Sequence, residues 1–420
     1  MAYLEYVHLS PVSSTTSCGP STFAPHLRLP DIERLPQIFW DTGASWSEVN
    51  LWALDKIQSQ HRDVETVNAL LKHLHAYASY LESSGLDWRH FPVRISNRSV
   101  YKYRGELVAR MKDGTIAGST ASARMAAIIQ FYRFARDEGL INTKYAMWTE
   151  HAFKTYYTDL TGFKRSITGQ STDLSIPNKS PPGNRLEDGL TPLSEPHMME
   201  LIKYTRSEAS EELHLMLTIG FFTGARLSTI TSLRIDTLEL AREDQYISDL
   251  YLLCVGPGTK VKTKFDVKGD ILIPGILLRR LKNYAYSPSR LKRESKSSKE
   301  NSSLLFITSR GKPYSKTAIG VLMTNLRREA VKAGYKFMMS FKFHQSRATY
   351  GTWLMKISLE VTTTGAAIEF VKSAMLHRHE STTLKYVKFL ESTAGKQKAA
   401  QEFYEAFSGL QGRDWNKYSA

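Results

Sequence analysis

The sequence has little cysteine and no long apolar run. Cys18 and Cys254 are its two cysteines, and they stand far apart in a chain of 420 residues. Such spacing excludes a disulfide framework and a zinc site built from cysteines, and it suits a reducing compartment. The most apolar window, residues 213–222, is far shorter than the roughly 20 residues that cross a bilayer. The first eight residues also lack the basic and apolar segments of an export signal. We therefore expect a cytoplasmic protein without a membrane segment.

Acidic residues are outnumbered by basic ones. The chain has 56 Lys and Arg against 41 Asp and Glu, which gives a formal charge of +15. A basic balance of this size indicates a polyanionic partner, and nucleic acid is the commonest. The alternative is a basic composition that serves solubility alone, and charge by itself does not separate the two.

The N-terminal part divides into an arm and a helical region. Ser, Thr and Pro cluster between residues 10 and 30, so residues 1–45 are expected to form an irregular arm or extension. Apolar residues then recur at helical spacing, which predicts a helical core domain over residues 46–150. The predicted helices begin near residue 46 and cover about 63–83, 97–111 and 119–138.

The fourth of these helices has the clearest pattern. Ser119 or Thr120 is expected to cap it, and Gly139 to end it. Its arginines either contact phosphates or form a solvated face, and its aromatic residues are expected in the core.

A polar stretch over residues 151–190 is expected to be a linker, because it lacks periodicity and is partly rich in Pro and Gly. Regular patterns return at a helix capped by Ser194. Strands are predicted at 249–255, 270–274 and 304–308. The connection between the first two contains four lysines: Lys260, Lys262, Lys264 and Lys268.

Several residues near the C-terminus could perform chemistry. His344 and Arg347 lie on one helix face, at the edge of an apolar stripe formed by Phe343, Tyr350, Leu354 and Ile357. Taken alone, the pair is typical of a solvated surface. Tyr386 could equally be a core residue with Phe389 and Leu390. His377 and His379, without a nearby cysteine, make a poor zinc site.

The order of these residues carries more information than any one of them. Arg226 follows Thr-Gly-Ala, a lysine-bearing hairpin comes next, then His344-x-x-Arg347, then His377, and Tyr386 stands nine residues later. This series resembles the tyrosine recombinase (phage integrase) family over about residues 46–395. Two positions depart from the family pattern. Thr229 stands where an acidic residue is common, and Leu376 stands where the glycine of Leu-Gly-His is expected.

The resemblance implies a mainly α fold with a small β component. It implies an N-terminal core-binding, SAM-like helical bundle and a mixed α+β catalytic domain over residues 191–395. It also implies a C-terminal tail, 396–420, that docks on a neighbouring subunit; packing of this tail onto its own domain is the alternative, and the sequence does not choose between the two. The expected partner is double-stranded DNA with specific recombination sites in the nucleoid. A homotetramer would assemble on two such sites from a monomer or weak oligomer, and no cofactor or metal is implied.

The same resemblance assigns roles to the residues. Tyr386 would be the nucleophile, and Arg226, Arg347, His344 and His377 would hold the phosphate. Lys262 is the expected general acid, with Lys260, Lys264 and Lys268 as alternatives. The chemistry suits these types, because a phenol retains the phosphate as an ester and paired guanidinium donors stabilise the charge of the transition state.

The implied activity is site-specific DNA recombination through a 3′-phosphotyrosine, in the service of a mobile element. Two alternatives remain: a type IB topoisomerase-like enzyme, and a DNA-binding protein with an inactive site. Integration, excision, resolution and transposition share this chemistry, and the target DNA sequence is not readable from the chain.

Overall fold

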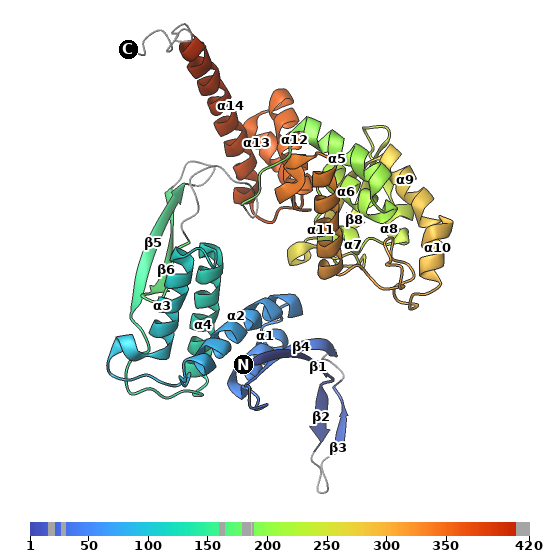
Figure 1. Ribbon diagram of the computed structural model, residues 1–420. Coiled ribbons are helices and arrows are strands. Elements are labelled where there is room, and N and C mark those ends of the chain that lie inside the picture. Colours follow the sequence, from blue (N-terminus) through green and yellow to red (C-terminus); the bar gives the residue numbers. More distant parts are fainter. Residues whose placement is uncertain (16–21, 27–30, 159–163, 179–185, 187–188, 409–420) are drawn as a thin grey trace. The chain divides into compact units, whose positions relative to one another are not determined.

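The computed structural model describes residues 1–15, 22–26, 31–158, 164–178, 186 and 189–408 (Figure 1). The described chain is mostly helical and contains small antiparallel sheets of two or three strands. The prediction of a mainly α fold with a small β component is therefore confirmed. Within these residues no helix is long and apolar enough to span a membrane.

The chain forms two compact units, Met1–Pro181 and Pro182–Ala420. In the first unit, four helices surround an apolar core. They are α1 (Ser47–Gln58), α2 (Val64–Ser83), α3 (Ser99–Lys112) and α4 (Gly118–Asp137). The predicted helices match these within about two residues, except that α4 starts after Ala117 and has no side-chain cap. The expected cap by Ser119 or Thr120 is thus wrong.

Aromatic residues dominate the core of the first unit. Trp46 and Trp52 both contact the ring of Phe131 edge-on, and Tyr77 lies against Tyr132. The two tyrosine hydroxyls share a hydrogen bond of 2.9 Å, and Tyr132 is within 2.6 Å of the Trp88 carbonyl oxygen. These polar groups are therefore satisfied inside an apolar environment.

The expectation of an irregular N-terminal arm is wrong for much of residues 1–45. Strand β1 (Tyr3–Leu9) pairs with β4 (Ile32–Phe39), and β2 (Val12–Thr15) pairs with β3 (Thr22–Pro25). Asn50 of α1 fixes β4, because its amide bonds to both the N–H and the carbonyl of Ile38 at 2.8 and 3.0 Å.

The expected linker also contains regular structure. Strands β5 (Glu150–Thr158) and β6 (Lys164–Thr172) form an antiparallel hairpin within the first unit. This stretch lacks apolar alternation because the hairpin makes little contact with an apolar core, not because it is an unstructured linker.

The second unit has a helical body and a three-stranded sheet. The sheet has the order β7–β8–β9, with β7 at Arg242–Glu243, β8 at Leu250–Val255 and β9 at Gly269–Pro274. The helices before it are α5 (Glu195–Glu208), α6 (Glu211–Thr223), α7 (Leu227–Thr231) and α8 (Ile235–Glu239). The helices after it are α9 (Gly275–Ala285), α10 (Pro288–Glu294) and α11 (Lys316–Lys332). Ser194 caps α5 as predicted, through the backbone N–H of His197.

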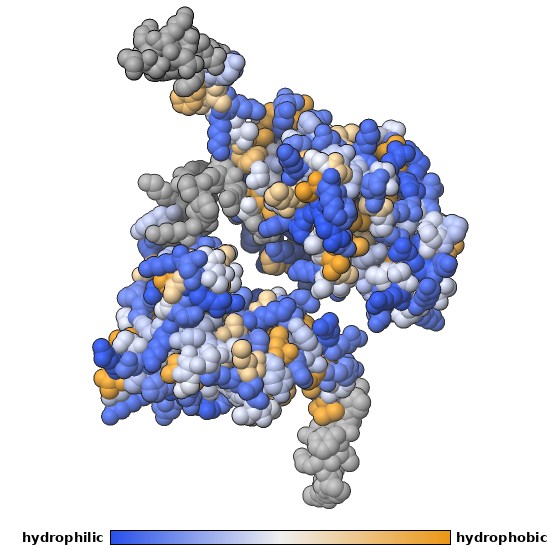
Figure 2. All heavy atoms as spheres, in the orientation of Figure 1, coloured by the Kyte–Doolittle hydropathy of each residue, from blue (hydrophilic) through white to orange (hydrophobic). Residues whose placement is uncertain are grey.

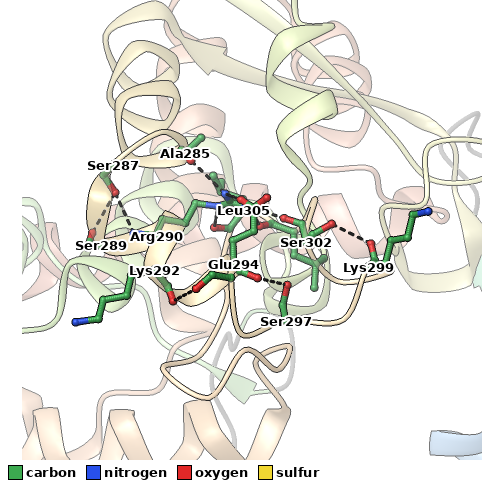
Figure 3. A network of polar contacts seen from close by, with 12 residues as sticks. Ala285, Ser287, Ser289, Arg290, Lys292, Glu294, Ser297, Lys299, Ser302 and Leu305 are labelled. Carbon is green, nitrogen blue, oxygen red and sulfur yellow. Dashed lines mark hydrogen bonds and ion pairs between the residues drawn. The ribbon is translucent and has the colours of Figure 1, made fainter.

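A strand was predicted at residues 304–308, but the structure has only isolated bridges there. Arg290 replaces the missing strand partners. It is fully buried, and it donates to the carbonyl oxygens of Ala285, Ser302, Leu304 and Leu305 at 2.6 to 3.2 Å (Figure 3). One guanidinium thus satisfies two backbone oxygens of the predicted strand, those of Leu304 and Leu305, together with the carbonyl groups of Ala285 at the end of α9 and of Ser302.

The last three helices form a separate apolar cluster. They are α12 (Gln345–Val361), α13 (Thr364–Ala374) and α14 (Glu380–Ser408). Helix α14 runs without a break across the expected boundary between catalytic domain and tail at residues 395/396. The described surface is mainly hydrophilic in the space-filling view, with apolar residues scattered over it (Figure 2).

Candidate active site

Arg226 follows a helix end whose shape depends on Gly224. Helix α6 ends at Thr223, and Gly224 then adopts the left-handed conformation with φ of +64°. A Cβ at this position would lie 2.4 Å from Cδ1 of Tyr350. Both the backbone and the packing therefore require glycine. The turn delivers Arg226, half-buried, to the N-cap position of α7.

Arg347 lies in the interior of the second unit with 2% of its surface exposed. Its Nη1 donates to the Gly224 carbonyl oxygen at 2.5 Å, and its Nη2 donates to the Met375 carbonyl oxygen at 2.8 Å. Each acceptor belongs to a helix end, where carbonyl groups lack intrahelical partners. One guanidinium thus joins the turn before Arg226 to the turn before His377.

The prediction that Arg347 lies at the edge of an apolar stripe is wrong. The apolar stripe itself is buried only in part: Phe343 and Tyr350 are buried, but Ile357 is 38% exposed. Arg347 is buried because distant carbonyl groups satisfy its donors, which local periodicity cannot reveal. His344, one turn earlier, is half-buried at the N-cap position of α12.

The turn before His377 is left-handed although it contains no glycine. Leu376 has φ of +51°. Its N–H donates to the Ser373 carbonyl oxygen at 3.0 Å, and the N–H of His377 donates to that of Lys372 at 2.9 Å. This is the usual bond pattern of a helix C-terminus that ends in glycine. The Leu376 departure therefore leaves the backbone geometry of the motif intact.

Leu376 packs closely over the glycine that begins β9. A Cβ on Gly269 would lie 2.5 Å from Cδ2 of Leu376, so a larger residue at this position would make the end of the leucine side chain move. The leucine also packs against the main apolar cluster of the second unit. This contact connects the His377 turn to the lysine-bearing hairpin.

Tyr386 is completely buried, on the first turns of α14. Its ring stacks on His377 with a centroid distance of 6.1 Å and an interplanar angle of 20°. It also lies close over α12, because a Cβ on Gly351 would be 2.6 Å from its Cε1. Tyr386 is thus part of an apolar cluster and a neighbour of His377 at once, so the two interpretations of its pattern do not exclude each other.

Thr383 is a site residue that the sequence analysis missed in this role. Its hydroxyl and Nδ1 of His377 are joined by a buried hydrogen bond of 2.9 Å. The bond orients the imidazole ring, so that the second ring nitrogen, Nε2, lies at the edge opposite Thr383. Thr383 stands three residues before Tyr386, hence on the same face of α14, and this spacing was the available signal.

The four hairpin lysines lie on the connection between β8 and β9, and all are exposed. The backbone N–H of Lys262 donates to Oγ of Ser232 at 2.9 Å, which ties the connection to the helix after Arg226. Lys264 lines a small cavity of about 10 Å³ together with Arg226, Arg347, Thr229 and other residues. Such a space holds about one water molecule. Lys264 thus comes nearer to both arginines than the sequence suggested.

Two other tyrosines are weaker candidates for the nucleophile. Burial raises the pKa of Tyr350 to about 12, although the nearby Arg347 opposes this shift. Tyr404 is 72% exposed. It stands far along α14, roughly 27 Å from Tyr386 at 1.5 Å per residue.

The structure therefore brings Arg347, His377, Tyr386 and the turn of Arg226 together, with His344 one helical turn from Arg347. His379 is exposed, unlike His377. In the described ranges, no group of three or more His, Cys, Asp or Glu side chains could hold a metal ion.

The C-terminal part of the chain matches a known protein family. Residues 190–393 match the phage integrase family. This range contains each of the sequence-predicted site residues. A search of curated proteins found no match.

Solved structures give distant likenesses. The Tn1549 transposon integrase in complex with a circular intermediate DNA is 12% identical, with a TM-score of 0.49, over 81% of this chain and 94% of that chain. A lambda integrase dimer bound to a COC′ core site is 13% identical, with a TM-score of 0.46 and the same coverage. The XerA recombinase is 13% identical, with a TM-score of 0.34, over 84% of this chain and 96% of that chain.

Proposed function

Residues 190–393 belong to the phage integrase family, and from this premise we propose that the protein is a site-specific DNA recombinase. It cleaves and rejoins strands through a covalent 3′-phosphotyrosine and serves a mobile element. One observation supports this best: the Arg347 guanidinium bonds to both the Gly224 and the Met375 turns, and so gathers the motif residues around Tyr386.

The proposed first step is a transesterification. The Tyr386 hydroxyl gives its proton to solvent and its oxygen attacks phosphorus, the phosphorus–O5′ bond breaks, and the 5′ oxygen leaves with a proton from Lys262. In the second step, a 5′-hydroxyl of the partner duplex gives its proton to Lys262 and attacks the phosphotyrosine, the phosphorus–tyrosine bond breaks, and the tyrosine oxygen takes a proton from solvent. The number of phosphodiester bonds is unchanged, so ATP is not needed.

The charge that develops on the non-bridging oxygens requires fixed donors. Arg226, Arg347 and His344 supply N–H groups, and His377 adds its Nε2 edge once Thr383 holds Nδ1. The loss of one such donor typically costs about 3 kcal/mol of transition-state stabilisation. Lys264 is the alternative acid, because Lys264 rather than Lys262 lines the cavity beside the arginines.

Access to the phosphate requires motion. Tyr386 is fully buried and Arg347 is 2% exposed. We infer that DNA engagement moves the start of α14, so that the tyrosine leaves its place between His377 and Gly351. Double-stranded DNA with two recombination sites and four copies of the chain would complete the reaction.

The test is covalent capture. The protein is incubated with a library of randomised duplexes, and DNA that stays attached in detergent is recovered. We expect an adduct with the wild-type chain and none with Tyr386→Phe, which still binds DNA. Tyr350→Phe and Tyr404→Phe are matched controls and should retain the adduct.

Two results would contradict the proposal. A normal adduct yield in Tyr386→Phe would assign the nucleophile to another tyrosine. Relaxation of any supercoiled plasmid, without joining of two partner duplexes, would identify a topoisomerase instead.

A further inference from the structure

The β5–β6 hairpin differs from the other sheets of the first unit. It forms a long two-stranded ribbon (Figure 1), and its described side chains before Thr172 are exposed or half-buried on both faces. Even its large residues face solvent, with Phe153 48% and Tyr156 68% exposed. An isolated hairpin is only marginally stable in water, so a ribbon of this kind indicates a surface for a partner.

The base of the hairpin is held firmly by the helices. Glu150 accepts from Nη2 of Arg133 at 3.2 Å and from Nε1 of Trp148 at 3.3 Å. Asp173, just after β6, accepts from the N–H of Thr149 at 3.2 Å and from the Tyr101 hydroxyl. The direction of the ribbon is therefore fixed, and both carboxylates at its base are occupied inside the protein.

Beyond this base the ribbon is basic. Residues 151–171 contain Lys154, Lys164 and Arg165 against a single acidic residue, Asp159, which lies outside the described residues. A surface with this balance complements a polyanion.

The two faces of the ribbon are different. Lys154 is paired with Thr168, and Tyr156 with Ser166, so these four residues share one face. The Lys154 ammonium lies 5.5 Å from the centre of the Tyr156 ring, which directs the charge along this polar face. On the opposite face the Phe153 ring lies over Gly169 of the paired strand, since a Cβ on Gly169 would lie 2.5 Å from Cζ of Phe153.

We propose that the polar face of the hairpin (Lys154, Tyr156, Ser166 and Thr168) contacts the phosphate backbone of the DNA duplex. This inference deepens the proposed function and rests on it. Ammonium and hydroxyl groups are the usual donors to phosphate oxygens. Nine residues per strand give a length of roughly 30 Å, close to one DNA turn of about 34 Å.

A protein partner fits this face less well. Protein interfaces are depleted in lysine and serine at their centre and enriched in aromatic residues. Only Tyr156 meets that description among the four residues. The phosphate backbone accounts for all four.

The experiment measures binding of the full chain to a mixed-sequence duplex of about 40 base pairs, roughly four turns, over a range of salt concentrations. Lys154→Ala should weaken binding several-fold and reduce the slope of log K against log salt by about 1. Lys154→Arg should restore both quantities. Lys332→Ala is the matched control, because that exposed lysine is already paired with Glu329 at 3.3 Å.

Unchanged affinity and salt slope in Lys154→Ala would overturn the hairpin proposal. So would a change in self-association, measured by sedimentation, without a change in DNA affinity, because the face would then be a protein interface. The same preparations are assayed for the Tyr386 adduct. A wild-type chain without an adduct would contradict the proposed function, whereas a normal adduct with unaltered salt dependence in Lys154→Ala would contradict the hairpin proposal alone.

Discussion

Helices α6 and α13 end in the same backbone conformation with different residues. Gly224 follows α6 with φ of +64°, and Leu376 follows α13 with φ of +51°. Each turn is followed closely by a motif residue: Arg226 stands two residues after Gly224, and His377 directly follows Leu376. At the first end a Cβ would meet the Tyr350 ring, whereas at the second the side chain fits against Gly269. Both helix ends thus share the left-handed turn, and their surroundings decide which residue forms it.

Arg347 is common to both ends. Replacement of its guanidinium group should therefore have the largest effect on the rate of adduct formation. In Arg347→Lys, one ammonium replaces the planar guanidinium and cannot reproduce both bonds at their present geometry. We expect the rate of adduct formation to fall by about 10²–10³, the usual loss for one oxyanion donor. Single-turnover kinetics on a duplex captured in the library experiment measure it.

Arg290→Lys is the matched control for this change. Arg290 is also buried and also bonds to several carbonyl oxygens, but these belong to α9 and to residues 302–305. Arg290→Lys should lower the free energy of unfolding measured in denaturant. The protein that remains folded should still form the adduct at the wild-type rate. Equal rate losses in both variants would show that Arg347 acts only through stability.

The next largest effect should come from a substitution of Gly224, at the end of α6. Gly224→Ala places an alanine in the left-handed region, which costs about 1 kcal/mol, and pushes a Cβ to 2.4 Å from the Tyr350 ring. Overpacking of this kind costs about 1–3 kcal/mol more. The total loss of unfolding free energy, about 2–4 kcal/mol, is measured in urea.

A double variant separates the two causes. In a Tyr350→Leu background the ring is absent, so Gly224→Ala should cost only the backbone contribution of about 1 kcal/mol. If the cost stays the same in both backgrounds, the Tyr350 contact does not explain the glycine.

Much of the site could be predicted because its residues stand in a fixed order. The series from Arg226 to Tyr386 identifies the family range without any contact information. What the series cannot give is burial. Arg347 is buried by carbonyl groups of Gly224 and Met375, which come from turns that no local pattern connects to it. His377 is fixed by Thr383, and the only sequence signal for that contact is the spacing of Thr383 before Tyr386.

The errors in the fold have related causes. Helices with a buried stripe were predicted closely, since one face packs on a core. The β5–β6 hairpin was missed because both of its faces meet solvent, so no alternation marks it. Residues 304–308 were predicted as a strand because they are apolar, yet the carbonyl groups of Leu304 and Leu305 bond to Arg290, and that of Ile307 bonds to Arg293, instead of a neighbouring strand.

The smallest effect is expected from a substitution of Leu376, in the turn after α13. Leu376→Gly removes left-handed strain of about 1 kcal/mol, but it also loses the contact with Gly269 and gains chain entropy when unfolded. These contributions nearly cancel, so the unfolding free energy should change by less than about 1 kcal/mol. Leu376→Ala keeps the strain and loses the contact, so it should be the less stable of the two variants.

This order is the informative result, because alanine is normally the more stable choice in a helix by about 1 kcal/mol. Ser373 provides the control, as it lies within α13 and is exposed. There, Ser373→Ala should be more stable than Ser373→Gly. If alanine is also preferred at Leu376, the left-handed turn is not what this position requires, and the equivalence of the two helix ends fails. If glycine is preferred only at Leu376, the leucine is tolerated for its contact with the lysine hairpin.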